Sequence, residues 1–176
     1  AEASSNLGRY DGIRYGYKTE SYNDINEMIC KTRSEGFGAE VQRRILLGTY
    51  VLSSGYYDAY YKKAQILRGK IVDAFSSAFQ KCDIILAPTV PVTALPQYYS
   101  SNAVDNYRTD ICTVPVNIAG LPGISVPCGK DENNMPVGMQ LIGKKFEEAT
   151  ILRAAHQYEK AARDTVFCPV KMGVKK

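Results

Sequence analysis

The sequence predicts an α/β fold, because segments with helical periodicity alternate along the chain with short apolar runs typical of buried strands. The clearest helical segment is residues 56–80, where apolar side chains recur every three or four positions. The clearest strand is CDIILAP (82–88), a short β-branched run that is closed by a proline. With 176 residues, 45% of them hydrophobic, the chain is long enough for one domain with a sizeable core.

The first third of the chain is predicted to be a loop followed by two helices. Residues 1–20 are rich in Gly, Ser, Asn and Tyr, which favours an ordered loop. A helix over 22–33 is expected to begin after Ser21, with Asp24 as an acid in its first turn. The segment SEGFG ends this helix, and a second helix is expected over about 39–52.

The long helix predicted over 56–80 has an apolar stripe that we expect to face the core. The members of the stripe are Tyr57, Tyr60, Ala64, Leu67, Ile71, Phe75 and Ala78. After the strand at 82–88, residues 89–107 are rich in Pro, Ser, Asn and Tyr. They predict a long surface loop, and loops of this length often carry function or contact a partner.

The last part of the chain predicts a helix, a sharp turn, two strands and a closing helix. A short helix over about 109–119 has Pro115 in its first turn and Gly120 as a left-handed C-cap. The strand ISVP, the polar turn KDENNMP and the strand VGMQLIG then follow. A closing helix is expected within 145–164, with acids early and bases late, as the helix dipole favours.

Cysteine usage and charge narrow the class of protein. The five cysteines are widely spaced and there is one histidine, so we expect no zinc site and reduced thiols in a cytoplasmic protein. No apolar run approaches the roughly 18 residues that span a membrane, and the first residues have no signal-peptide pattern. The net charge of +4 is scattered, and the KMGVKK end is expected to be solvated, so no nucleic-acid surface is predicted.

Two charged positions are candidates for a binding site. Arg43 and Arg44 lie in an otherwise apolar helical segment and point about 100° apart, so one of them is expected to lean inward and to require an anionic partner. That partner is either an internal Asp or Glu, or the carboxylate of a ligand held bidentately. Asp110 is likewise either an acid at a helix start or a receptor for a ligand ammonium group.

A complete catalytic constellation is not evident in the sequence. The single histidine, His156, lies within the predicted closing helix and is expected to be solvated or at the edge of the core rather than part of a triad. The glycines are too sparse for a phosphate-binding loop. Glu147 and Glu148 are interpreted as charges at a helix start rather than as a catalytic acid and base.

Several segments of the chain resemble the C-terminal part of amidase-signature enzymes. GLPGISVP and PVGMQLIG are similar to that family in general, whereas RSEGFGAEVQRRILLGTYVLSSGYYDAYY resembles the A subunits of glutamyl-tRNA(Gln) amidotransferases. SNLGRYDGIRYGY, the strand-closing APT and DICTVPVNIAG add to the resemblance, which covers about residues 1–164 and leaves 165–176 as a tail. The resemblance implies part of an α/β/α sandwich around a mixed sheet.

The resemblance also implies a reaction and partners. Such an A subunit hydrolyses glutamine, and a B subunit uses the ammonia and ATP to convert Glu-tRNA(Gln) to Gln-tRNA(Gln), while a C subunit tethers the other two. By motif match, Arg44 would bind the α-carboxylate of glutamine and Asp110 its α-ammonium group. ATP and Mg are implied for the whole complex, tRNA is an indirect partner through it, and no residue of this chain is assigned to a metal or cofactor.

The catalytic residues of the resembled family, a lysine and two serines, have no match in this sequence. We therefore expect them upstream of Ala1, and we expect the chain alone to be inactive and to expose apolar surface. Two alternatives remain. One is another amidase-signature hydrolase with a different amide substrate. The other is a non-catalytic interaction module that contacts partners through residues 96–107 and the YYDAYY segment.

Overall fold

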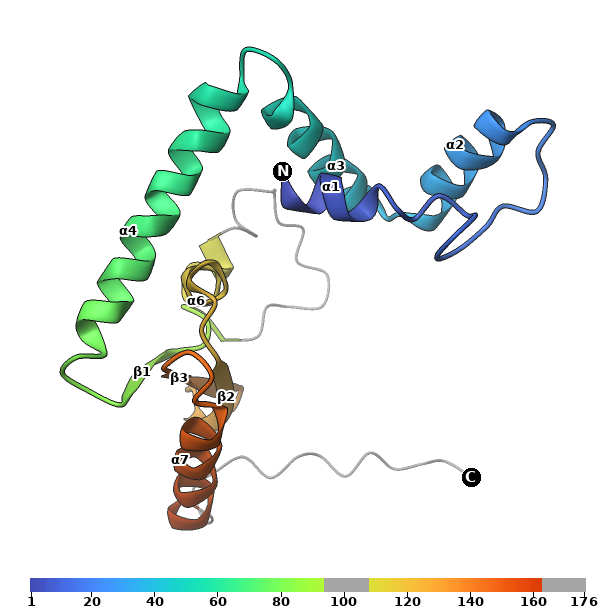
Figure 1. Cartoon of the computed structure of the whole chain (residues 1–176). Helices are drawn as coiled ribbons and strands as arrows, with labels where there is room; N and C mark the ends of the chain where they lie inside the picture. The colour runs from blue at the N-terminus through green and yellow to red at the C-terminus, as the bar shows by residue number, and fades with distance from the viewer. Residues whose placement is uncertain (94–107, 163–176) are drawn as a thin grey trace, which may run out of the picture. The chain divides into compact units, whose positions relative to one another are not determined.

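The computed structural model describes residues 1–93 and 108–162 (Figure 1). Residue contacts divide the chain into two compact units, with the division between Leu67 and Arg68. Most of the loop predicted at 89–107 and the whole tail predicted at 165–176 lie outside the described residues. The assignment of 1–164 to one domain portion therefore stays a prediction.

The first unit is built from helices. In chain order these are α1 (Glu2–Leu7), α2 (Ile25–Gly36), α3 (Ala39–Leu52) and the π-helix η1 (Tyr57–Lys62). The predicted bounds of α3 are confirmed. The predicted cap of α2 is wrong, because Asp24 and not Ser21 caps it: the Asp24 carboxylate accepts a hydrogen bond from the backbone N–H of Glu27 at 2.9 Å.

The helix α1 replaces the start of the loop that was predicted over residues 1–20. It forms because it packs on α3, where Gly48 has no Cβ and lets the chain at Ser4 approach closely. The hydroxyls of Ser4 and Thr49 lie 2.9 Å apart at this contact. A helix of this length is marginal in isolation, so tertiary contact and not local propensity decides it.

The segment that joins α1 to α2 is an ordered loop, as predicted. The backbone N–H of Thr19 donates to the hydroxyl of Thr32 at 3.0 Å, and both residues are buried. The guanidinium of Arg33 donates to the carbonyls of Leu7 and Tyr10 at 2.8 and 3.1 Å. Two residues of α2 thus hold the loop in place.

The long helix predicted over 56–80 is present in two parts, η1 and α4 (Lys63–Ala78). The prediction that its apolar stripe faces a core is wrong for the part of the chain that the structure describes. Tyr60 is 52% exposed and Leu67 58% exposed, and none of the residues of α4 is buried. The periodicity is real, but the described residues cover this face only in part: Ile71, Phe75 and Ala78 are half-buried.

The second unit contains a small sheet. Its strands are β1 (Ile84–Pro88), β2 (Gly123–Lys130) and β3 (Pro136–Gly143), in the order β1-β3-β2. Both pairs are antiparallel, so the parallel pairs of a mixed sheet do not occur among these described strands. Together with the helices, the sheet confirms the predicted α/β class.

Helices lie on both faces of the sheet. On one face, α7 (Glu148–Ala161) packs on β2 and β3, and the core there consists of Val126, Leu141, Ile151 and Ala155. On the other face, Val116 of α6 (Val114–Ala119) lies next to Gly123, whose register partner in β3 is the buried Ile142. This arrangement places the turn before α6 above the central strand.

Candidate functional site

Arg44, the predicted carboxylate-binding residue, lies on α3 in the first unit. Its Nε donates to the carboxylate of Glu40 at 2.8 Å, with the two residues one helical turn apart. Arg43 also pairs with the Glu40 carboxylate. The structure thus supplies the acidic partner that was expected for one arginine, and the same acid serves both.

The prediction that one of the two arginines leans inward is wrong in this structure. The side chain of Arg43 is 48% exposed and that of Arg44 is 54% exposed. Both remain at the surface because their face of the helix is open, as the exposed neighbours Leu46 and Leu47 also show. The role of Arg44 in binding a ligand stays a prediction.

Glu40 is a residue of this cluster that the sequence reasoning missed. The available signal was its spacing, because positions three and four residues apart are neighbours on a helix surface. The hydrogen bond from Arg44, together with the positive charge of Arg43, lowers the pKa of the Glu40 carboxyl below its ordinary value. Glu40 is therefore an anion at neutral pH and pairs with both guanidinium groups at the surface.

Asp110, the predicted ammonium-binding residue, lies in the second unit, in the turn that leads into α6. Its backbone carbonyl accepts hydrogen bonds from the N–H groups of Thr113 and Val114 at 3.1 and 2.9 Å. Its side chain is half-buried. The helix begins at Val114, later than predicted, so Asp110 belongs to the turn before the helix and not to its first turn.

Gly120 ends α6 as the sequence predicted. It has φ 69° and ψ 39°, and its N–H donates to the carbonyls of Asn117 and Val116. Pro115 lies in the first turn, where the missing N–H has no cost. The left-handed glycine then directs the chain into β2, so the turn of Asp110 and the sheet are joined by a short, stiff segment.

Gln140 is a second residue that the sequence reasoning missed. It lies on the central strand β3 and is only 6% exposed. Its Nε2 donates to the carbonyl of Cys112 at 3.0 Å and, at a longer 3.5 Å, to that of Pro88. The signal in the sequence was one polar residue within an apolar strand, since a buried amide requires a partner.

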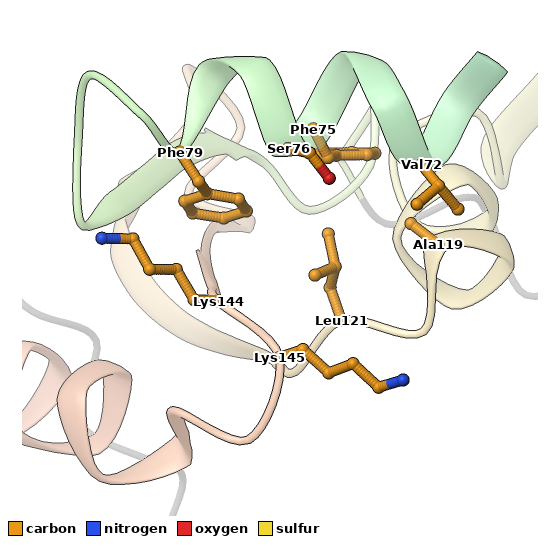
Figure 2. Close-up of a pocket in the computed structure, with 8 residues that line it drawn as sticks. All are labelled: Val72, Phe75, Ser76, Phe79, Ala119, Leu121, Lys144 and Lys145. Atoms are coloured by element: carbon orange, nitrogen blue, oxygen red, sulfur yellow. The ribbon is translucent and has the colours of Figure 1, made fainter. Parts of the chain in front are cut away.

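A shallow cavity of about 240 Å³ lies elsewhere in the second unit. Figure 2 shows Val72 and Phe75 of α4, with Phe79 directly after this helix, facing Ala119 at the end of α6 and Leu121 just beyond it. Lys144 and Lys145 complete the lining, and Lys144 is paired with Asp83 at 2.8 Å. The lining is largely apolar and contains neither Arg44 nor Asp110, so this cavity is separate from the candidate site.

The remaining chemistry-bearing side chains do not gather into a site in the part of the chain that the structure describes. His156 is exposed on α7, as expected. Glu147 and Glu148 occupy the N-cap and first turn of α7, which confirms their interpretation as helix-start charges. Within residues 1–93 and 108–162, no three His, Cys, Asp or Glu side chains are grouped to hold a metal ion. Among the helices of these same residues, none has the length and apolar character of a membrane span.

Comparison with known proteins defines the family. The family model described as "Amidase" matches residues 1–152. The chain therefore belongs to the amidase family, and the predicted resemblance to amidase-signature enzymes is confirmed. The layered arrangement of helices on a sheet is consistent with this membership.

Within the family, the chain is similar to proteins named as the A subunit of glutamyl-tRNA(Gln) amidotransferase. It is 55% identical over 161 residues to that of Thiobacillus denitrificans, covering 91% of this chain and 33% of the relative. It is 56% identical over 163 residues to that of Azoarcus sp., covering 92% of this chain and 34% of the relative. These similarities confirm the predicted resemblance to such A subunits.

A solved structure is also similar to this chain. The crystal structure of the glutamyl-tRNA(Gln) amidotransferase A subunit from Thermotoga maritima matches with a TM-score of 0.57 and 43% sequence identity, over 76% of this chain and 30% of that chain. The chain thus spans about a third of the length of the relatives that it matches.

Proposed function

We propose that this chain is the glutamine-binding portion of a glutaminase subunit that supplies ammonia for converting Glu-tRNA(Gln) to Gln-tRNA(Gln). The observation that carries the proposal is the 55% identity to a protein named as the A subunit of that amidotransferase, over 91% of this chain. The catalytic lysine and serines of the family lie outside this sequence in our proposal, and the chain alone is inactive.

Arg44 is proposed to bind the α-carboxylate of glutamine. A guanidinium presents its N–H donors in a planar fork that matches a carboxylate. Its present partner, Glu40, is itself a carboxylate at the surface, and surface ion pairs exchange at little cost. A substrate carboxylate can therefore replace or share that contact when glutamine binds.

Asp110 is proposed to bind the α-ammonium group of glutamine. No hydrogen bond or ion pair joins its carboxylate to another residue within the described part of the chain. Recognition of both charged groups would favour a free amino acid over a simple amide, because an analogue that lacks one group loses one of the two charged contacts.

The test of Arg44 uses Arg43 as its matched control. The two residues are adjacent on α3, similarly exposed and paired with the same glutamate. In the complete enzyme, Arg44→Gln should reduce kcat/KM for glutamine hydrolysis about a hundredfold or more, the size expected when a charged contact is lost. Arg43→Gln should change kcat/KM for glutamine hydrolysis about twofold or less, since this variant keeps Arg44.

Unchanged glutaminase activity in the Arg44→Gln enzyme would refute the assignment of the carboxylate site. Equal losses in both variants would point to a general effect of charge on α3. Ammonia release in the absence of tRNA is the appropriate measurement, because it reports glutamine hydrolysis without the later amide transfer.

The partners follow from the same proposal. The chain would act with a B subunit that performs the ATP-dependent transfer and with a tethering C subunit, in the cytoplasm, and tRNA would be contacted through the complex. ATP and Mg are proposed for the whole complex, and the proposal assigns no residue of this chain to either.

A hydrolase acting on another amide is the alternative enzyme function. Its support is structural, since the chain also matches a "Crystal structure of amidase" with a TM-score of 0.59 at 26% identity. The two functions differ in selectivity. A preference for glutamine over an amide without the α-ammonium group supports the glutaminase, and its absence supports the alternative.

A further inference from the structure

Gln140 occupies a fixed position on the central strand. It pairs with Ala87 of β1 on one side and with Ser125 of β2 on the other, in antiparallel register. Strand neighbours on both sides leave its backbone little freedom to move. By the alternation of the strand, its side chain lies on the face opposite Leu141, which belongs to the core under α7.

The Gln140 side chain joins this rigid strand to the turn that carries Asp110. Its amide donates to the carbonyl of Cys112 at 3.0 Å, a contact that spans 28 positions in sequence. Cys112 lies between Asp110 and Thr113, and the N–H of Thr113 closes the turn on the Asp110 carbonyl at 3.1 Å. A shift of the Cys112 carbonyl would therefore move Asp110 with it.

We propose that Gln140 is a positioning residue for the ammonium-binding part of the glutamine site. Through its hydrogen bond to the Cys112 carbonyl, it sets the position of the Asp110 turn relative to the sheet. This inference rests on the proposed function, because it takes Asp110 as the group that binds the ammonium. Gln140 itself does not touch the substrate.

The chemistry of the contact requires a donor of this length at this position. The acceptor is a carbonyl oxygen, so a carboxylate or a thioether at position 140 leaves it unsatisfied. Methionine is close to glutamine in length and is tolerated in irregular cores. Gln140→Met therefore removes the donor and fills nearly the same volume.

The experiment compares two substrates in the complete enzyme. Glutamine carries the α-ammonium group, whereas glutaramate has the same amide and carboxylate but lacks that group. Gln140→Met should raise KM for glutamine about tenfold with kcat changed less than about twofold, while kcat/KM for glutaramate stays within about twofold. A loss of folded enzyme lowers kcat for both substrates equally, so the ratio of the two activities is unaffected by stability.

Ser125→Ala is the matched control. Ser125 is the register partner of Gln140, and it makes a hydroxyl contact with Thr89 at 2.7 Å on the same face of the sheet, without touching Cys112. It should leave the preference for glutamine over glutaramate unchanged. Asp110→Asn should reduce this preference, and adding Gln140→Met to it should reduce the preference no further, because both act on one contact.

The outcomes separate the two proposals. If Gln140→Met reduces both activities in proportion while Asp110→Asn changes the preference, the positioning role is wrong and the ammonium site stands. If Asp110→Asn leaves the preference unchanged, the ammonium assignment fails and the positioning role fails with it. Additive effects in the double variant would also overturn the positioning role.

Discussion

The contact between α7 and the sheet can be tested at Ile151. This residue is 3% exposed and belongs to the core with Val126 and Leu141. Its Cγ2 lies 2.8 Å from the position that a Cβ on Gly143 would occupy, so α7 sits directly on the end of β3. Replacing it by alanine removes three carbon atoms at about 0.8 kcal/mol each, which comes to about 2.4 kcal/mol before any cavity remains.

The expected cost of Ile151→Ala is therefore about 3 kcal/mol, because a partly unrelaxed cavity adds to the transfer term. Ile151→Val should cost about 1 kcal/mol. Leu152→Ala is the control on the same helix, since Leu152 is 56% exposed, and it should change the free energy of unfolding by no more than about 0.5 kcal/mol.

Urea denaturation followed by circular dichroism gives these free energies. If Ile151→Ala and Leu152→Ala lower the free energy of unfolding by amounts that agree within about 1 kcal/mol, the packing of α7 on β2 and β3 is refuted.

Two further predictions concern a glycine cap and an acid. Gly120→Ala should lower the free energy of unfolding by about 1 kcal/mol because Gly120 has φ 69°. Gly69→Ala, within α4 and with open space around it, should instead be neutral or stabilising in thermal melts, and equal effects would contradict the cap. Hydrogen bonds from Lys31 and Asn23 lower the pKa of Glu27 from 4.5 to about 2. Since this folded-state pKa is depressed, the stabilisation is present above about pH 4.5 and is lost as the pH falls through about 2. A carboxyl titration by NMR with its midpoint near 4.5 would show that these hydrogen bonds are absent in solution.

Local signals in the sequence were sufficient for most of the second unit. Gly120 was identified as a left-handed cap because only glycine adopts that conformation without strain. The strands at 84–88 and 136–143 were found from short apolar runs bounded by turn residues. These features depend on neighbouring residues, which is why they could be read without a structure.

The errors occurred where long-range contact decides the outcome. The stripe on α4 has the period of a core-facing helix, but periodicity does not say whether another segment covers it. The helix α1 could not be predicted because Gly48 stabilises it from 44 positions away, at the contact with Ser4. The prediction that one arginine leans inward was wrong for the same reason, since the helical pattern does not say which face of α3 another segment covers.

For the candidate site, the sequence by itself determined the residue types: an arginine on a helix, an aspartate before a glycine-capped helix, and the motifs of the amidase family. Only the tertiary structure decided which groups hold these residues. Gln140 reaches the turn of Asp110 from a strand 28 positions beyond Cys112, whereas the pair of Glu40 and Arg44 lies within one helix and follows from their spacing. Chemistry is encoded in the side chain itself, whereas its position depends on hydrogen bonds between segments that the fold brings together.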